Sequence, residues 1–495
     1  MSRNLTTNKL TDQLARLNDV LCAVNTLNWD ARTQMPAGGA TTRGQQIATL
    51  MGLARSMIID PAMQAAVDEA GDDPSASVAQ EAIDYHRRLP AELLKAQSES
   101  ATVAGAAWAK ARASSDFSLF QPHLEKVVDL ARQSADALGY EKHPYDPMVR
   151  IYEPGETAAS LSCFFDELRS GILPILDTAR GRPVPRTDFL YRHYPQAGQQ
   201  AFATGTAQSL GFDFERGRLD TTVHPFEVSF TRNDVRITSR WPEQYLPMSI
   251  FGSIHEVGHA LYEQGIAPEL TRSAFATDMI GLYAVGGTSF GMHESQSRLY
   301  ENHVGRSAPF WEKHYVRLRD TFPDQLRDVS VDEFLAAVNR VEPGAIRVEA
   351  DELSYDLHIM LRVKIEMGLM DGSLSVADIP DVWREAMHND LGVAIDDDAN
   401  GCLQDVHWSS GYLGSFPTYT IGNATAAQLM AHLDEQSPQI RHALNSADTA
   451  PLNEALTEKV WQWGRRKTRA QILEASGLKA NDASPYLAYL KGKFS

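Results

Sequence analysis

The segment Ser253-Ile-His255-Glu256-Val-Gly-His259-Ala-Leu-Tyr262-Glu-Gln-Gly265 carries two histidines four positions apart, with a glutamate directly after the first. Residues four apart lie on one face of an α-helix, so His255 and His259 can offer two imidazole nitrogens to one metal ion while Glu256 projects beside it. A helix is expected because apolar residues recur at steps of three and four, at Ile250, Phe251, Ile254, Val257 and Leu261. The alternative is a buried helix with two core histidines and a charged residue between them.

The length and composition indicate a large protein with a sizeable core. The chain has 495 residues, of which 43% are hydrophobic, and it is longer than one compact domain usually is. One large two-lobed unit and two or three separate domains both fit this length. We favour a single unit over residues 1–495, with an N-terminal helical lobe at about 1–215, a metal-binding and catalytic core at 216–425 and C-terminal helices at 426–495.

Charge and cysteine content exclude several classes of protein. The formal net charge of −18 argues against a nucleic-acid partner, because the field around the protein would repel a polyanion. The three cysteines, Cys22, Cys163 and Cys402, are far apart and odd in number, which indicates neither a disulfide framework nor a cysteine zinc site and favours the cytoplasm. No stretch approaches 18 consecutive apolar residues, and the first residues lack a basic start followed by an apolar run, so neither export nor membrane insertion is expected.

Periodicity along the chain predicts a mainly α fold. Helical patterns cover residues 5–27, 41–59, 77–112, 117–138, 157–179, 289–304, 331–341, 346–367, 376–389, 425–444, 452–476 and 485–493. Alternating apolar and polar positions predict a strand pair at 223–231 and 235–240, joined around Asn233-Asp234. We therefore expect a large two-lobed helical protein with a deep cleft and a small antiparallel β-sheet beside the metal helix.

A third metal ligand is needed, because a catalytic zinc usually has three protein ligands and one open position. Glu294 is the best candidate: it lies on a predicted helix 35 positions after His259. An exposed surface glutamate is the alternative. His293 could bind instead, but adjacent helical residues point about 100° apart, so only one of the two is expected to reach the ion. Glu256 would then serve as the base that takes a proton from water activated by the ion.

Several further motifs resemble the carboxypeptidase Taq family of metallocarboxypeptidases over most of the chain. They are His224-Pro225-Phe226, Asp234-x-Arg236-x-Thr238, His255-Glu256-x-x-His259, His293-Glu294-Ser295-Gln296, Ile346-Arg347-x-x-Ala350-Asp351 and Gly401-x-x-Gln404-Asp405-x-His407-Trp408. The resemblance implies a helical fold with a cleft, removal of single residues from peptide C-termini, and a homodimer that holds zinc or cobalt. It also implies that His255, His259 and Glu294 bind the metal and that Glu256 is the general base. Two imidazoles and one carboxylate would also accept manganese.

Substrate binding can be assigned only in part. Arg347 is our preferred anchor for the terminal carboxylate of a peptide, because a guanidinium pairs with a carboxylate through two hydrogen bonds. A structural pair between Arg347 and Asp351, four positions on, is the alternative. His224 and Arg236 belong to the predicted hairpin, which would either bind the substrate backbone along its edge or close one end of the cleft.

The segment from His407 to Tyr419 resembles a histidine and two tyrosines in the thimet oligopeptidase and neurolysin group. The corresponding groups there donate hydrogen bonds to the oxyanion of the tetrahedral intermediate. By this resemblance His407 and Tyr419 are candidate catalytic residues, and Tyr412 is a candidate substrate-binding residue. The alternative is a structural role for all three, since buried tyrosines and histidines usually have one.

Three functions are compatible with these residues. The first is a metal-dependent carboxypeptidase that acts on peptides with a free C-terminus. The second is a metal-dependent oligo-endopeptidase or dipeptidase, which would not need a cationic anchor such as Arg347. The third is an inactive, metal-stabilised binding protein, which would need neither Glu256 nor an open coordination position.

Overall fold

The computed structural model describes residues 9–495, of which the greater part is helical and only short segments form strands. The chain divides into two compact units. The first contains the described chain up to Arg87 together with Pro185–Val338 and Leu429–Ala480, and the second contains Arg88–Val184, Asn339–Gln428 and Asn481–Ser495. The predicted mainly α fold is confirmed.

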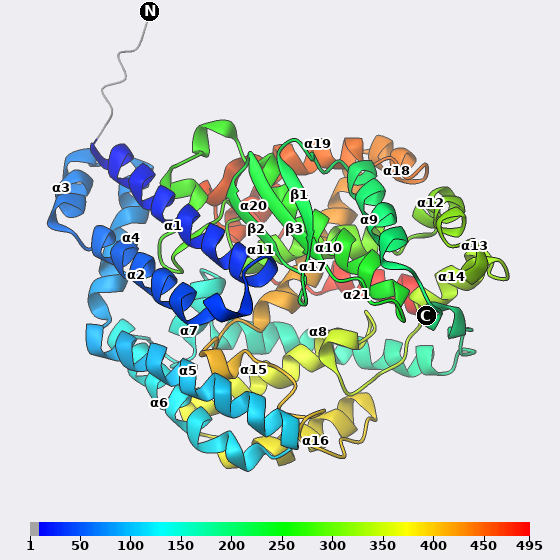
Figure 1. Cartoon of the computed structure of the whole chain (residues 1–495), viewed down its shortest axis with the longest axis horizontal. Helices are drawn as coiled ribbons and strands as arrows, with labels where there is room; N and C mark the ends of the chain where they lie inside the picture. Colours follow the sequence, from blue (N-terminus) through cyan, green and yellow to red (C-terminus); the bar gives the residue numbers. More distant parts are fainter. Residues whose placement is uncertain (1–8) are drawn as a thin grey trace, which may run out of the picture. The chain divides into compact units, whose positions relative to one another are not determined.

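The first unit contains two small sheets and most of the helices (Figure 1). Its helices are α1 (Lys9–Thr33), α2 (Ala40–Ile58), α3 (Pro61–Ala70), α4 (Pro74–Arg88), α9 (Gln196–Leu210), α10 (Leu246–Gly265), α11 (Phe290–Arg298), α12 (Ala308–Thr321), α13 (Pro323–Leu326), α14 (Val331–Val338), α18 (Pro438–Leu444), α19 (Ala450–Lys459) and α20 (Arg469–Ala475). A π-helical turn, Leu299–Val304, directly follows α11. The strands are β1 (Gly217–Thr221), β2 (Glu227–Thr231), β3 (Asp234–Ser239), β4 (Thr277–Asp278) and β5 (Tyr283–Ala284).

Helix α10 lies at the centre of this unit. It packs against α9, α11 and strands β2 and β3, and its predicted apolar face is buried, with Ile254 1% and Val257 1% exposed. Pro247 occupies the first turn, where its missing N–H has no helical partner to lose. The helix ends at Gly265.

The predicted hairpin is confirmed, but the sheet is mixed and not purely antiparallel. Strands β2 and β3 pair antiparallel, with Val228 opposite Arg236, and a register shift lies between Ser229 and Thr231. Strand β1 pairs parallel to β3, with Leu219 opposite Ile237. The sequence did not predict β1 because Gly217-Arg-Leu-Asp-Thr has only one apolar residue and therefore little alternation.

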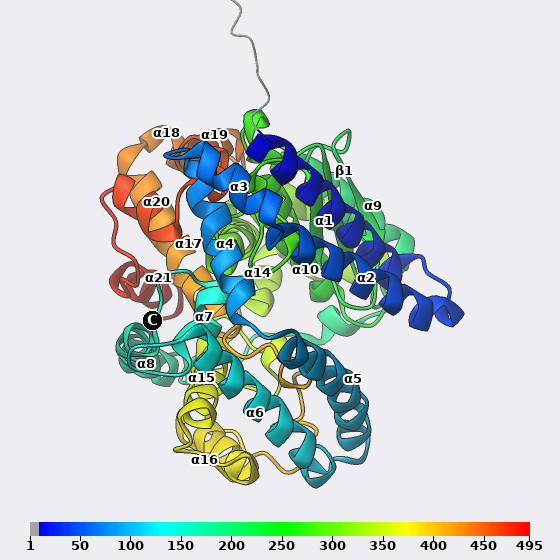
Figure 2. The same ribbon diagram turned by 90° about the vertical axis from the view of Figure 1, so that its left-hand side faces the viewer.

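Helix α1 closes one side of the first unit. Its leucines Leu10, Leu14, Leu17 and Leu21 recur on one face and share an apolar cluster with residues of α2, α3 and α4. The same helix also packs on β2 and β5. Figure 2 gives a second view of α1 to α4.

The second unit consists of helices. They are α5 (Ala91–Ser114), α6 (Gln121–Leu138), α7 (Asp146–Tyr152), α8 (Ala158–Arg180), α15 (Tyr355–Asp371), α16 (Ile379–Leu391), most of α17 (Pro417–Gln436) and α21 (Ser484–Phe494). Helices α5 and α6 pack side by side (Figure 2). Helix α15 is buried on almost all sides and carries two buried carboxylates, Asp356 and Glu366.

Several predicted helices have different bounds in the structure. The pattern at 452–476, for example, is divided into α19 and α20 by a 3-10 segment, Trp461–Arg466. The pattern at 77–112 is two helices, because Pro90 separates α4 from α5. The pattern at 346–367 becomes a helix only from Tyr355, and Arg347 lies in a short 3-10 turn, Arg347–Glu349. The side chain of Arg347 is therefore not on an α-helical face with Asp351.

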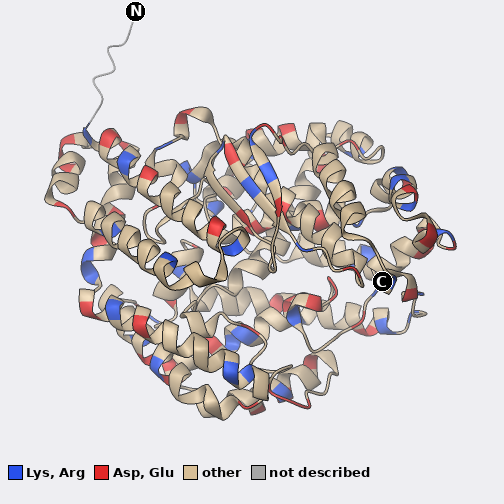
Figure 3. Ribbon diagram, viewed as in Figure 1, with Lys and Arg blue, Asp and Glu red and all other residues tan. Residues whose placement is uncertain are grey.

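Acidic and basic residues are interspersed along the helices, as Figure 3 shows. Many of them pair with each other, for example Arg192 with both Asp188 and Asp328. Among residues 9–495, no helix combines the length and apolar character needed to cross a bilayer.

Candidate active site

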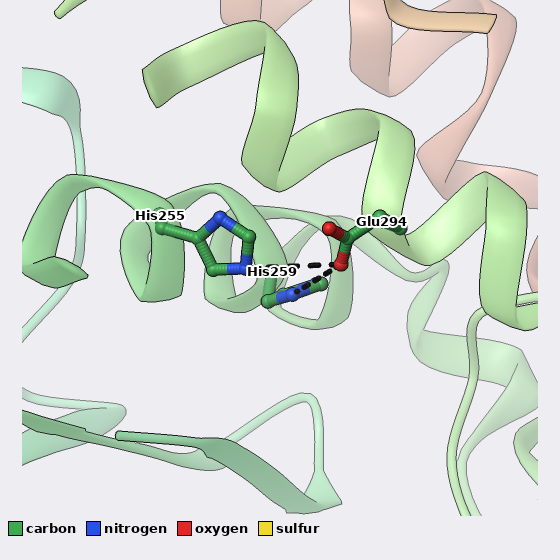
Figure 4. A group of neighbouring side chains, drawn as sticks. All are labelled: His255, His259 and Glu294. Carbon is green, nitrogen blue, oxygen red and sulfur yellow. Dashed lines mark ion pairs between the residues drawn. The ribbon is translucent and has the colours of Figure 1, made fainter. Parts of the chain in front are cut away.

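Helices α10 and α11 bring His255, His259 and Glu294 together (Figure 4). The Oε2 atom of Glu294 lies 3.7 Å from Nε2 of His255 and 3.5 Å from Nε2 of His259. One ligand atom from each of the three residues lies within 4.8 Å of the other two. In the part of the chain that the structure describes, this is the one group of three or more such residues able to hold a metal ion.

The charges of this group suit a divalent cation. Burial alone would raise the pKa of Glu294, but Arg298, His255 and His259 more than offset it, so the group is a carboxylate. Burial lowers the pKa of His259 to about 3, which keeps its imidazole neutral. For His255, burial lowers the pKa, but Glu294 and Glu301 raise it more strongly, because the two carboxylates favour a positive charge beside them, which a bound metal ion would supply.

The types and the number of these ligands fit a catalytic metal site. Two imidazole nitrogens and one carboxylate oxygen leave at least one coordination position open, whereas a structural zinc site usually has four protein ligands. Glu256, next to His255, is buried, and its Oε2 atom has no hydrogen-bond partner among the described residues. Burial raises the pKa of Glu256 to about 7, against the influence of His255. A carboxyl group with a pKa near 7 is suited to exchange protons at neutral pH.

Each histidine of the group has a partner behind it that the sequence did not reveal. Nδ1 of His255 lies 3.0 Å from Oε2 of Glu301. Glu301 also pairs with Arg298 at 3.3 Å and with Arg306 at 3.1 Å. Glu301 is seven positions after Glu294, a spacing that places both on one face of a helix. This spacing is the sequence feature that could have identified Glu301 as a residue near the metal-binding group.

His293, the alternative ligand considered from the sequence, lies behind His259. Its Nδ1 atom is 2.6 Å from Nδ1 of His259, and its Nε2 atom is 3.0 Å from Oε1 of Glu263. It is not a member of the metal-binding group. Adjacent helical residues point apart, which separates His293 from Glu294, but no local pattern identifies His259 as the partner of His293.

In the second unit, Arg347 is buried and pairs with Asp405. Its Nε and Nη2 atoms lie 3.0 and 2.7 Å from Oδ1 of Asp405, and its Nη1 atom donates to the hydroxyl of Tyr355 at 3.1 Å. Arg362 donates to the other oxygen of Asp405 at 2.6 Å. The alternative pair with Asp351 is wrong, because Arg347 pairs with Asp405 instead, while Asp351 accepts hydrogen bonds from the backbone of Leu353 and Ser354.

His407 and Tyr419 meet beside Arg347. Nε2 of His407 lies 3.3 Å from the hydroxyl of Tyr419, and the guanidinium of Arg347 lies 5.2 Å from the centre of the Tyr419 ring. Burial lowers the pKa of His407 to about 4, although Asp405 opposes this, so the imidazole is neutral. Tyr412 does not join them through any described hydrogen bond of its ring hydroxyl, and the residue is 46% exposed.

The two hairpin candidates have different surroundings. His224 is exposed in the segment before β2, and its backbone carbonyl accepts a hydrogen bond from Arg32 at 3.3 Å. Arg236 pairs with Asp234 through two hydrogen bonds of 2.9 Å, and its guanidinium lies 4.5 Å from the centre of the Trp29 ring. These contacts hold Arg236 within the sheet region of the first unit.

Comparisons with known proteins agree with this geometry. The family model described as carboxypeptidase Taq (M32) metallopeptidase matches residues 9–494. Carboxypeptidase 1 of Bacillus subtilis is 37% identical over 496 residues, covering 98% of this chain and 97% of that protein. Thermostable carboxypeptidase 1 of Thermus thermophilus is 37% identical over 493 residues, covering 94% of each.

A solved structure is similar to this chain in fold as well as in sequence. The crystal structure of the M32 carboxypeptidase from Deinococcus radiodurans superposes with a TM-score of 0.93 at 37% identity, covering 98% of both chains. The chain therefore belongs to the carboxypeptidase Taq (M32) metallopeptidase family and is a metallocarboxypeptidase, a peptide hydrolase.

Proposed function

We propose that His255, His259 and Glu294 hold a zinc ion and that Glu256 is the general base of C-terminal peptide hydrolysis. The observation that carries this proposal is the three-ligand group with a buried, unpartnered carboxyl oxygen on the residue next to His255. When bound, the ion supplies Lewis acidity, which polarises the scissile carbonyl and lowers the pKa of water from about 15.7 towards 7. Cobalt or manganese would suit the same donors.

Glu256 moves the proton in this proposal. Its pKa of about 7 lets it accept a proton from the attacking water and then pass that proton to the departing amine. A glutamine at this position keeps the shape but cannot accept the proton. Glu256→Gln should therefore retain the metal and lose hydrolysis.

Arg347 is the proposed anchor of the substrate's terminal carboxylate. Three of its five N–H groups have partners in Asp405 and Tyr355, which leaves two for a ligand. Arg347 and Arg362 share one carboxylate, so the cluster has a positive charge in excess, which a carboxylate would balance. This supports a preference for peptides with a free C-terminus.

Tyr419 and His407 are the proposed hydrogen-bond donors to the oxyanion. Their mutual contact and the neutral state of His407 support this role, since a neutral imidazole has one N–H to donate. We also propose substrate-binding roles for Tyr412, His224 and Arg236, of which Tyr412 and His224 are exposed. We also propose that residues 1–495 form a single catalytic unit.

We further propose a cytoplasmic homodimer. The three cysteines are free thiols in the structure, which suits a reducing compartment. Light scattering after size-exclusion chromatography would test the dimer, and fractionation of cells that express the native chain would test the location.

The main experiment compares an unblocked peptide with the same peptide amidated at its C-terminus. The zinc-loaded protein and metal-checked Glu256→Gln are each incubated with both peptides, and the products are followed by mass spectrometry. Stepwise loss of residues from the free acid alone, absent in the variant, is the expected result. Internal cleavage, or equal cleavage of the amide, would show an endopeptidase and contradict the proposal.

A second measurement addresses the metal. Removal of the ion with a chelator should abolish hydrolysis, and zinc or cobalt should restore it. If Glu294→Gln binds zinc as tightly as the unchanged protein, the proposed ligand set is wrong.

A further inference from the structure

A chain of three side chains extends from the metal-binding group into the interior of the first unit. Nδ1 of His259 lies 2.6 Å from Nδ1 of His293, and Nε2 of His293 lies 3.0 Å from Oε1 of Glu263. Glu263 is on α10, one turn beyond His259, and its side chain is 3% exposed. The series of side chains thus ends on a buried carboxylate.

The surroundings of Glu263 require it to accept hydrogen bonds. The backbone N–H groups of Gly286 and Gly287 donate to its two oxygens at 2.9 and 2.8 Å, and the hydroxyl of Ser229 donates at 2.9 Å. These three donors are directed at the two oxygens of the carboxyl group, and hydrogen bonds to the charged form favour it, so Glu263 is ionised. An ionised carboxylate has no proton to give, so Nε2 of His293 must be the donor in their contact.

The donor role of Nε2 of His293 determines where the hydrogens lie on the rings of His293 and His259. A neutral imidazole carries one N–H, so His293 that donates from Nε2 accepts at Nδ1. Nδ1 of His259 must then be the donor in the 2.6 Å contact. Its single hydrogen is used there, and Nε2 of His259 keeps the lone pair that a metal ion needs.

We propose that His293 and Glu263 are positioning residues that hold His259 in its metal-binding tautomer and orientation. The inference rests on the proposed metal site and adds to it two residues that do not contact the ion. Partners of this kind typically change metal affinity about 10- to 100-fold when they are removed.

The two histidine ligands are held in different ways. His255 donates directly to the carboxylate of Glu301, whereas His259 reaches its carboxylate through an intervening imidazole. A second carboxylate near His293, Glu227, is 3.8 Å away and beyond hydrogen-bond distance. Glu263 is therefore the carboxylate that determines the proton position on His293.

The absence of side chains at Gly286 and Gly287 leaves room for Glu263 and His293. A Cβ atom at position 287 would lie 2.3 Å from Cδ2 of His293, and one at 286 would lie 3.2 Å from Oε2 of Glu263. Both contacts are closer than side chains ordinarily tolerate. The two glycines thus let the backbone N–H groups approach Glu263 while the ring of His293 stays in place.

The test measures zinc affinity by competition with a chromophoric chelator, using the full chain. In Glu263→Gln, the side-chain amide can donate hydrogen bonds to His293, whereas the carboxylate can only accept them. The amide therefore no longer requires a hydrogen on Nε2 of His293. The hydrogen on Nδ1 of His259 is then no longer required either. His293→Leu removes the link altogether. Both variants should bind zinc about 10- to 100-fold more weakly, and both should alter the visible spectrum of the cobalt-loaded protein.

Two further variants serve as controls. His293→Gln keeps an acceptor for His259 and a donor for Glu263, so it should recover most of the affinity that His293→Leu loses. Glu366→Gln is the matched control, because Glu366 is also buried and accepts three hydrogen bonds, from Tyr145, Trp408 and Gly414 in the second unit. It should bind zinc like the unchanged protein. The melting temperature of each metal-free variant establishes that it is folded.

The outcomes separate the two proposals. If the unchanged protein binds zinc and both Glu263→Gln and His293→Leu bind it equally well, the positioning role is overturned and the metal site stands. Equal losses in Glu263→Gln and Glu366→Gln would also overturn it, since they would report general destabilisation. Failure of the unchanged protein to bind zinc would instead overturn the metal site itself.

Discussion

Arg347 and Arg362 donate to opposite oxygens of the same buried carboxylate, that of Asp405. The two guanidinium groups differ in what else surrounds them. Arg362 is fully buried, with its guanidinium 4.5 Å from the centre of the Trp383 ring and a hydrogen bond to the carbonyl of His358. Arg347 is 6% exposed and has two N–H groups beyond those that contact Asp405 and Tyr355, whereas Arg362 is inaccessible, so Arg347 is the member of the pair that can reach a ligand.

Arg347→Lys should selectively weaken the recognition of a free C-terminus. An ammonium group cannot reproduce the two-point contact of a guanidinium with a carboxylate. The loss of a charge-assisted hydrogen bond corresponds to about 10- to 100-fold in kcat/KM, which should appear mainly in KM. Steady-state kinetics with paired free-acid and amidated peptides measure this effect.

Arg362→Lys is the matched control for that substitution. It alters the same ion-pair cluster and should lower the melting temperature, yet it should preserve the ratio of activities on the two peptides. If both lysine variants lose the preference for the free acid equally, the total charge of the cluster matters and Arg347 has no special role.

Tyr419→Phe should lower kcat by about 100- to 1000-fold with little change in KM, because an oxyanion donor acts chiefly in the transition state. Tyr412→Phe, at a position 46% exposed, should change kcat little and affect mainly KM. The kinetic parameters of the two variants on one peptide decide between these roles. A near-normal kcat in Tyr419→Phe would remove this tyrosine from the catalytic residues.

The sequence predicted that His255, His259 and Glu294 lie together because the information is local. A spacing of four places His255 and His259 on one face, and one helical glutamate at a suitable distance completes the set. The partners behind the ligands were not predicted, since Glu301 and Glu263 resemble any other helical glutamate until the packing of α10 on α11 is known.

Arg347 shows how tertiary structure overrides a local pattern. Periodicity predicted a helix from 346, which would place Asp351 one turn away, but the regular helix starts only at Tyr355. Asp405 is 58 positions further along the chain, and the fold alone brings the two residues together. The pairing of β1 with β3 was missed for the same reason, because no local signal identifies a parallel partner.

The stability of the second unit should depend on pH through Glu366. Burial raises the pKa of Glu366 to about 7, although hydrogen bonds from Tyr145, Gly414 and Trp408 oppose this. The pKa in the unfolded chain is about 4.3, so the contribution of Glu366 to stability is complete below that pH and is lost as the pH rises through 7. The free energy of unfolding therefore decreases by about 3 kcal/mol over this pH range.

Thermal unfolding of the metal-free protein tests this at pH 4.5, 6 and 8. The amide in Glu366→Gln does not titrate in this range, so the unchanged protein should lose melting temperature relative to the variant as the pH increases. Parallel curves for the two proteins would contradict the assignment of this pH dependence to Glu366.

Gly258, between Glu256 and His259, should be required for the metal site because of the space it leaves for α11. A Cβ atom at this position would lie 2.5 Å from both the carbonyl oxygen of Gln296 and Cα of Ser297, which are backbone atoms that cannot rotate away. Gly258→Ala should therefore push α11, and with it Glu294, away from the two histidines. Zinc affinity should fall by at least about 10-fold, the effect typical of losing a residue that positions a metal ligand.

Gly252 provides the matched control on the same helix. Nothing lies within 4 Å of a Cβ atom there, so Gly252→Ala should leave zinc affinity unchanged. It should also stabilise the protein by about 1 kcal/mol, because alanine favours a helix more than glycine does. Chelator competition and thermal unfolding on both variants separate the two effects: equal zinc affinity in Gly258→Ala and Gly252→Ala would mean that the close approach of α11 does not determine the position of Glu294.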